Sequence, residues 1–181
     1  MTWPALVGIA LLPYVTFGVG AFVMGQLSGR RDVLQRLKKL PDGDRKPLNQ
    51  RLRGYDLPAV KRLWGALALD PNLLLSEERS LRLDLVFPLL YGTAFATSLF
   101  LAWGDREPSV LLWLLLPVVI LILADWRENL MQLKQLRLYR QAGPDALMAS
   151  GIQVASRATI TKLLLFIGCH VLLLFVLLSN V

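Results

Sequence analysis

The chain contains four long apolar stretches without a charged residue, and these stretches limit its fold more than any other feature. They cover residues 2–29, 85–104, 108–124 and 163–181. A bilayer core about 30 Å thick is crossed by roughly 20 apolar helical residues, so three of the stretches reach or nearly reach the length of a span. The third is shorter, with 17 residues, but its apolar pattern resumes at Leu130 and Met131.

The composition agrees with a membrane protein. Apolar residues make up 55% of the 181 residues and charged residues 18%, whereas soluble domains have about 45–50% and 25%. A chain of this length is too short to cover four such helices with a polar shell. We therefore predict an all-α, polytopic membrane protein, with one domain of four transmembrane helices and short amphipathic cytoplasmic helices. The expected spans are residues 4–27, 84–104, 108–130 and 160–180.

The positive charges predict how the bundle is oriented. Of the twenty Lys and Arg residues, all except Arg106 fall within or beside two connecting segments, 29–83 and 131–159. Because Lys and Arg are enriched in cytoplasmic loops, we expect both segments to be cytoplasmic and both termini to lie outside. The expected location is a bacterial cytoplasmic (inner) membrane. No Lys or Arg precedes the first stretch, so we expect a retained anchor and not a cleaved signal peptide.

This topology accounts for the net charge of +7. Basic cytoplasmic segments are expected to contact a lipid bilayer with anionic headgroups. The charge therefore gives no reason to predict binding to nucleic acid.

The first connecting segment is predicted to contain three helices. Residues 31–40 have the pattern of a basic amphipathic helix that lies on the membrane or extends the first span. A second helix is expected from Pro58 to Leu69, and its apolar stripe either docks on the protein itself or binds a partner. Ser76 is expected to cap a third helix that runs straight into the second span. The apolar stripe of the second helix consists of Val60, Leu63, Trp64 and Leu67.

The second connecting segment is predicted to be largely helical. A stripe of leucines continues the third span beyond the membrane to about Arg140, before the sequence Ala142-Gly143-Pro144 stops it. Residues 149–162 are expected to lead into the fourth span as helix.

Polar side chains gather where the predicted second span begins. Asp84, Pro88 and Tyr91 share one helical face because they stand at positions i, i+4 and i+7. Pro88 has no backbone N–H, so the carbonyl oxygen of Asp84 is free to accept a hydrogen bond from another group.

Two other predicted spans carry polar residues at the same depth. Asp125, Glu128 and Asn129 share a face at the end of the third span, and Thr159 and Lys162 share one where the fourth begins. These positions predict an interhelical cluster of Asp84, Asp125, Glu128 and Lys162, with Arg82, Arg127 and Arg157 close by.

Three interpretations of this cluster remain open. It pins the register and depth of the helices, it binds a headgroup, an ion or a proton, or it is simply exposed in the headgroup layer. A divalent cation held by Asp84, Asp125 and Glu128 is chemically feasible because hard cations prefer oxygen ligands. The spacing matches no metal-binding motif, however, and neither a metal site nor a cofactor is predicted.

His170 lies eight residues after Lys162, about 12 Å further into the predicted membrane. An intramembrane histidine is a candidate proton relay or cofactor ligand. The simpler interpretation is a hydrogen bond to Tyr91, Thr93, Thr97 or a backbone carbonyl of a neighbouring helix. Cys169 is expected to be an apolar filler, because a thiol in lipid stays protonated.

Residues 83–92, 124–129 and 155–162 resemble uncharacterised bacterial four-span membrane proteins. Those proteins carry an Asp-Pro-Tyr pattern at the start of one span, an Asp-x-x-Glu-Asn pattern at the end of the next, and a Ser/Thr-rich segment ending in Lys before the last. The resemblance covers about half of the chain and implies no known activity.

Two functional hypotheses follow from the sequence. The first is a non-catalytic accessory or scaffold subunit of a membrane complex, which contacts other membrane subunits or anionic lipid. The second is a small transporter or lipid- or ion-binding protein that uses the carboxylate–lysine cluster. The Gly-rich phosphate loop, the Gly-x-Ser-x-Gly elbow and the His-Glu-x-x-His motif are missing, so an intramembrane enzyme with catalytic carboxylates is a weaker third hypothesis.

Overall fold

The structure is a computed structural model that describes residues 2–40, 45–104 and 106–179. In this part of the chain all regular elements are helices. Four candidate spans are long and apolar enough to cross a membrane, which confirms the predicted all-α, four-helix membrane protein. They are formed by α1 (Trp3–Ser28), α4 and α5 (Pro71–Leu83 and Phe87–Trp103), α6 (Pro108–Ala142) and α7 (Ala149–Leu178).

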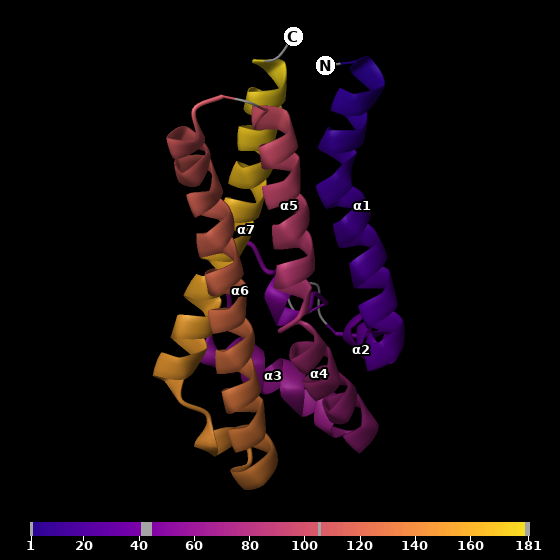
Figure 1. Ribbon diagram of the computed structural model, residues 1–181. Coiled ribbons are helices and arrows are strands. Elements are labelled where there is room, and N and C mark those ends of the chain that lie inside the picture. Colours follow the sequence, from indigo (N-terminus) through magenta and orange to yellow (C-terminus); the bar gives the residue numbers. More distant parts are fainter. Residues whose placement is uncertain (1, 41–44, 105, 180–181) are drawn as a thin grey trace.

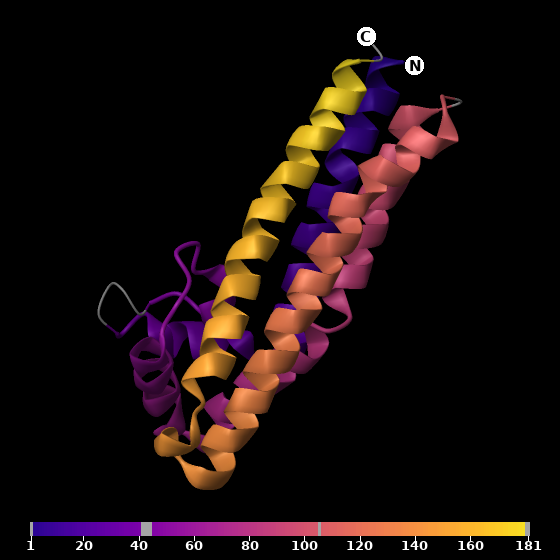
Figure 2. The same cartoon turned by 90° about the vertical axis from the view of Figure 1, so that its left-hand side faces the viewer.

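The two connecting segments lie at the same end of the bundle (Figure 1). This end, which we call the basic end, carries α2 (Arg30–Leu37), η2 (Leu48–Gln50), α3 (Leu57–Ala68), α4, and the turn η3 (Pro144–Ala146) between α6 and α7. The first turn of α1 and the last turn of α7 lie together at the opposite end (Figure 2). The fold therefore has the arrangement that the positive charges predict, although which end faces the cytoplasm stays a prediction.

Gly29 separates α1 from α2. Its φ of 70° lies in the left-handed region, which glycine adopts without the steric cost of a side chain. The chain turns there, so α2 does not extend the first span. Instead α2 buries Val33 and Leu37 against the other helices of the basic end.

The predicted apolar stripe of α3 is buried within the protein. Asp56 caps the helix by accepting a hydrogen bond from the backbone N–H of Ala59 at 2.9 Å. The side chains of the stripe are fully inaccessible and pack on α4 and α6. Of the two interpretations that the sequence left open, docking on the protein itself is confirmed. These side chains are Val60, Leu63, Trp64 and Leu67.

The prediction that Ser76 caps the third helix is wrong. The helix α4 begins six residues earlier, because Asp70 accepts from the N–H of Asn72 at 2.9 Å and Pro71 occupies the first helical position. An Asp-Pro pair suits these two positions, since proline lacks only an N–H that has no helical partner there.

The expectation of one unbroken helix from α4 into the second span is also wrong. The α-helical hydrogen-bond pattern is interrupted by a turn at residues 84–86, although Asp84 and Val86 keep right-handed backbone angles, and α5 starts at Phe87 with Pro88 in its first turn. Because Pro88 cannot donate, the carbonyl of Asp84 is left free, and the side chain of Asn129 donates to it at 3.0 Å. The predicted free carbonyl is thus confirmed, and a buried amide satisfies it.

Helices α6 and α7 both extend past the apolar stretches, as predicted. The 35 residues of α6 and the 30 residues of α7 run side by side to the basic end (Figure 2). Gly143, with a φ of 80°, ends α6 where the sequence predicts a stop. Their extensions pack on α3 and α4, so the basic end is built partly from the same helices as the membrane span.

Candidate functional site

Lys162 lies between two carboxylates in the middle of the structure. Its Nζ atom is 3.1 Å from Oδ1 of Asp125 and also contacts Oε2 of Glu128. Both carboxylates come from α6 and the lysine comes from α7, and all three side chains are largely inaccessible to solvent. The spacing predicted by the sequence therefore brings these three charges together.

Asp125 is held by donors from three helices. Besides Lys162 on α7, the hydroxyl of Tyr91 on α5 donates to Oδ2 at 2.7 Å. The side-chain amide of Asn129, on α6 itself, donates to Oδ1 at 2.9 Å. Since Asn129 also contacts the carbonyl of Asp84, Asp125 is the point where the break between α4 and α5 is tied to α6 and α7.

Glu128 connects the network to the basic end. Its Oε1 accepts from the hydroxyl of Thr159 at 2.7 Å and from the amide of Gln132 at 3.0 Å. Gln132 in turn donates to the hydroxyl of Tyr55 at 2.8 Å. Burial, with a smaller contribution from the nearby Glu128 carboxylate, raises the pKa of Tyr55 well above its usual value. Tyr55 is therefore a neutral hydrogen-bonding group at neutral pH.

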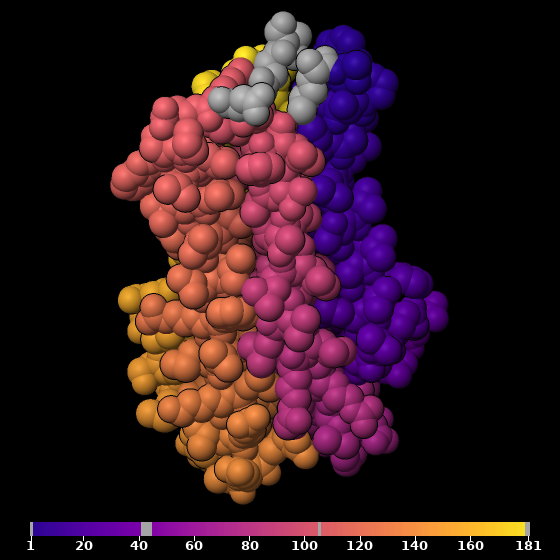
Figure 3. All heavy atoms as spheres, viewed as in Figure 1, coloured from indigo at the N-terminus to yellow at the C-terminus, as the bar shows by residue number. Residues whose placement is uncertain are grey.

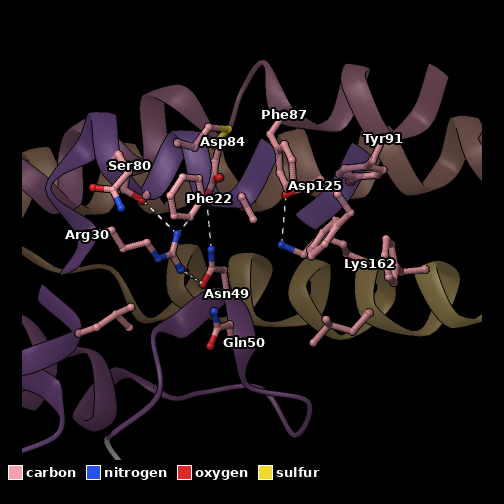
Figure 4. A pocket seen from close by; sticks show the side chains of 18 of the residues that line it. Phe22, Arg30, Asn49, Gln50, Ser80, Asp84, Phe87, Tyr91, Asp125 and Lys162 are labelled. Atoms are coloured by element: carbon pink, nitrogen blue, oxygen red, sulfur yellow. Dashed lines mark hydrogen bonds and ion pairs between the residues drawn. The ribbon is translucent and has the colours of Figure 1, made fainter. Parts of the chain in front are cut away.

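Asp84 belongs to a second group of polar side chains beside the first. Its Oδ2 accepts from the amide of Asn49 at 3.2 Å and lies 3.7 Å from the guanidinium of Arg30. Arg30 also donates to Oδ1 of Asn49 at 2.8 Å and to the hydroxyl of Ser80 at 3.0 Å. These contacts join α1–α2, η2 and α4 at the basic end (Figure 4).

The two polar groups line the same pocket. Its volume is about 520 Å³, and Arg30, Asn49, Asp84, Asp125 and Lys162 form its polar end (Figure 4). The rest of the wall is mostly apolar and aromatic, and includes Phe17 and Phe22 from α1, Phe87 from α5, and Leu163 and Phe166 from α7. The pocket follows the seam between α1 and α7, two helices that touch only lightly, because α1 packs mainly on α5.

The segment between α2 and α3 covers the polar end. Asn49 and Gln50 of η2 line the pocket, and η2 packs against α7 (Figure 2). The backbone N–H of Tyr55 donates to the hydroxyl of Ser156 on α7 at 2.8 Å, which fixes the segment there. The polar end is therefore bordered by the connecting segment, while the apolar part lies between α1 and α7, two helices with many exposed apolar side chains.

Several residues of the predicted cluster lie elsewhere. Arg82 forms an ion pair with Glu78 on its own helix. Neither Arg127 nor Arg157 has a hydrogen bond or ion pair with the cluster in the described part of the chain. Arg30 does contact the cluster, through the carboxylate of Asp84. It directly follows the first apolar stretch, and the sequence pattern predicts no role for it in the site.

His170 lies apart from the cluster. The prediction that it forms a hydrogen bond with a neighbouring helix is wrong, because its partner is on its own helix. Its Nδ1 atom is 2.8 Å from the carbonyl oxygen of Phe166, one turn earlier in α7. Its ring lies among those of Tyr14, Phe95 and Phe166, with centroid distances of 4.2 to 4.6 Å. The imidazole therefore packs as one ring of an aromatic cluster between α1, α5 and α7.

Asn49, Tyr55, Ser80 and Gln132 complete the network but are missing from the predicted site. All four are uncharged, and three come from segments whose position depends on tertiary packing. Gln132 is the exception, because it follows Glu128 at i+4 on one face of α6 and extends the predicted polar row.

Among the described residues, no group of three His, Cys, Asp or Glu side chains is arranged to hold a metal ion. No protein-family model, curated protein or solved structure matches the chain. The resemblance to bacterial four-span proteins therefore stays a prediction, and the function has to be inferred from the geometry of the site.

Proposed function

We propose that this small integral membrane protein binds a single-chain or double-chain membrane amphiphile in the pocket between α1 and α7. The observation that carries the proposal is the pocket itself, in which an aromatic wall continues directly into a buried, charged end. Its volume of about 520 Å³ falls within the usual range for ligand sites, roughly 300–1,000 Å³.

The two halves of the pocket favour an amphiphile over other ligands. A pure hydrocarbon would leave Arg30 and Asp84 desolvated without new partners, which is costly. A small polar metabolite would leave the aromatic wall in contact with water. A lipid with its chain along Phe17 and Phe166 and its head near Arg30 satisfies both halves.

The polar end favours a headgroup that both accepts and donates hydrogen bonds. Arg30 and Lys162 offer N–H groups, and the Asp84 carboxylate offers acceptor oxygens. Arg31 also lines the pocket and has no hydrogen bond or ion pair with any described side chain. A glycerol phosphate headgroup has the oxygens and hydroxyls that match this set.

The accessory or scaffold hypothesis stays a prediction, as do protein partners and the inner-membrane location. The pocket supports the second hypothesis of the sequence, a lipid-binding protein or small transporter, more directly. Whether the amphiphile is moved across the bilayer depends on opening of the α1–α7 seam.

The pocket can be filled by one substitution. Gly25 lines it, and a Cβ atom at this position meets nothing within 4 Å. We expect Gly25→Leu to weaken binding of lysophosphatidylglycerol at least tenfold, because the leucine side chain occupies the space of the ligand's chain. Native mass spectrometry of the full chain in mild detergent measures the bound fraction against lipid concentration.

Gly18→Leu is the matched control. Gly18 lies two turns earlier on α1, is equally open to a Cβ atom, and does not line the pocket. Both substitutions replace a helical glycine, so they change helix propensity alike. Unchanged affinity in Gly25→Leu, or an equal loss in both variants, would overturn the proposed pocket.

A further inference from the structure

A second hollow lies on the outer surface of the bundle, between the end of α4 and the extension of α6. It has a volume of about 570 Å³ and is lined by basic and apolar residues only, apart from one glutamine. These two helices lie side by side on the face shown in Figure 3. Arg82, Lys134 and Arg137 supply the charge, and Leu85 and Leu130 supply the apolar part nearest the membrane span.

The groove has an excess of positive charge. Glu78 is the acid next to it, and this carboxylate is shared between Arg82 and Arg140. Lys134 and Arg137 have no hydrogen bond or ion pair with any residue that the structure describes. No carboxylate lines the groove. A bound anion would therefore meet Lys134 and Arg137, together with Arg82, whose guanidinium also pairs with Glu78.

The groove also spans the boundary between apolar and basic surface. Trp126 donates its indole N–H to the carbonyl of Leu85 at 2.8 Å, and tryptophan is typical of the membrane interface. Leu130 is 55% exposed beside it. Arg82 lies only three residues before Leu85, and the side chains of Lys134 and Arg137 lean back along α6 toward the span, as helical side chains do.

We propose that this groove binds an anionic phospholipid, with the phosphate between Arg82, Lys134 and Arg137 and an acyl chain on Leu85 and Leu130. Basic pockets between helices at the membrane surface recognise such headgroups through charge, while the leucines hold the chain. The site is distinct from the α1–α7 pocket, since the two share no lining residue.

The test is a lipid titration of the full chain in mild detergent, followed by native mass spectrometry. The wild-type protein is expected to bind phosphatidylglycerol more tightly than phosphatidylcholine. The double variant Lys134→Gln/Arg137→Gln is made in the Gly25→Leu background, in which the α1–α7 pocket is filled. Its affinity for phosphatidylglycerol is expected to be roughly thirty-fold lower than that of Gly25→Leu alone, because each basic residue near an anionic lipid contributes about one kcal/mol. With Gly25 intact, the double variant is expected to bind lysophosphatidylglycerol in the α1–α7 pocket as tightly as the wild type, which separates this proposal from the proposed function.

The matched control is Lys38→Gln/Lys39→Gln, which removes the same charge from two exposed positions at the same end. We expect this control to weaken phosphatidylglycerol binding less than about threefold. Lys38 and Lys39 do not line the groove, and salt screens exposed charges that act on a bound lipid only from a distance. An equal loss in both double variants would overturn the site in favour of diffuse attraction. Equal wild-type affinity for the two lipids, or no loss in Lys134→Gln/Arg137→Gln, would overturn it as well.

Discussion

Replacing Lys162 by methionine is expected to lower the free energy of unfolding by about 3–5 kcal/mol, the usual cost of removing one partner of a buried ion pair. Lys162 is the cation in contact with both Asp125 and Glu128. Methionine keeps much of the side-chain volume, so the loss reports on charge more than on packing. Reversible unfolding in mixed micelles measures the change.

A second substitution separates this ion-pair effect from a packing defect. In Lys162→Met/Glu128→Gln the amide of residue 128 can still accept from Thr159 and Gln132, while one uncompensated charge is gone. We therefore expect the double variant to be less destabilised than the sum of the two single variants. Strict additivity would contradict a direct interaction between Lys162 and Glu128.

The exposed pair Lys61–Asp145 is the control for this experiment. Its Nζ–Oδ1 distance is 2.8 Å, but Asp145 is 93% exposed, and water screens such pairs strongly. The contact with Lys61 holds the pKa of Asp145 below its usual value. Lys61→Met is expected to leave the unfolding curve nearly unchanged.

Replacing Trp64 by alanine is expected to destabilise the protein by about 3–5 kcal/mol, as large-to-small changes in a packed core do. Trp64 on α3 is fully inaccessible and packs edge-on against the ring of Tyr139 on α6, with centroids 5.8 Å apart. The cavity left by the indole would open between the connecting segment and the extension of the third span. Unfolding in mixed micelles again gives the free energy.

Trp113→Ala is the matched control, because Trp113 is 73% exposed on the apolar surface of α6. We expect it to cost far less than Trp64→Ala, since no cavity forms in the protein. Similar small effects in both variants would show that α3 does not pack as a core helix.

The sequence predicts those parts of the fold that depend on local pattern. The four spans follow from uninterrupted apolar stretches, and the stripe of α3 follows from helical spacing. That the carbonyl oxygen of Asp84 has no helical partner follows from the missing N–H of Pro88. Each needs only the residues within a few turns of one helix, so no knowledge of the tertiary structure is required.

The candidate site is less predictable because it needs the position of the connecting segment. Asp125 directly follows one apolar stretch and Lys162 directly precedes another, so the sequence predicts that both lie at the same depth in the membrane. Asn49 and Tyr55, by contrast, reach the site only because η2 and the following residues dock on α7. Arg30 joins them because Gly29 turns the chain at the end of α1. Such contacts are long-range, so no periodic pattern signals them.

The pocket is the feature that is hardest to predict from the sequence. It exists because α1 packs on α5 and only lightly on α7, and helix pairing cannot be read from apolar stretches alone. Ala21 and Gly25 of α1 line the pocket. Small residues at such spacing are common in membrane helices, so they do not by themselves indicate a cavity.

The central claim is that four helices cross the bilayer and leave both connecting segments on one side, where they close the polar end of the pocket. Cys169 is the single cysteine of the chain, so Cys169→Ser provides a background for new cysteines at the exposed positions Lys39, Glu107 and Met148. A membrane-impermeant maleimide added to sealed vesicles of one orientation measures which positions are accessible. We expect Lys39→Cys and Met148→Cys to react from the same side and Glu107→Cys from the other. Labelling of Lys39→Cys and Met148→Cys from opposite sides would contradict the bundle and, with it, both proposed lipid sites.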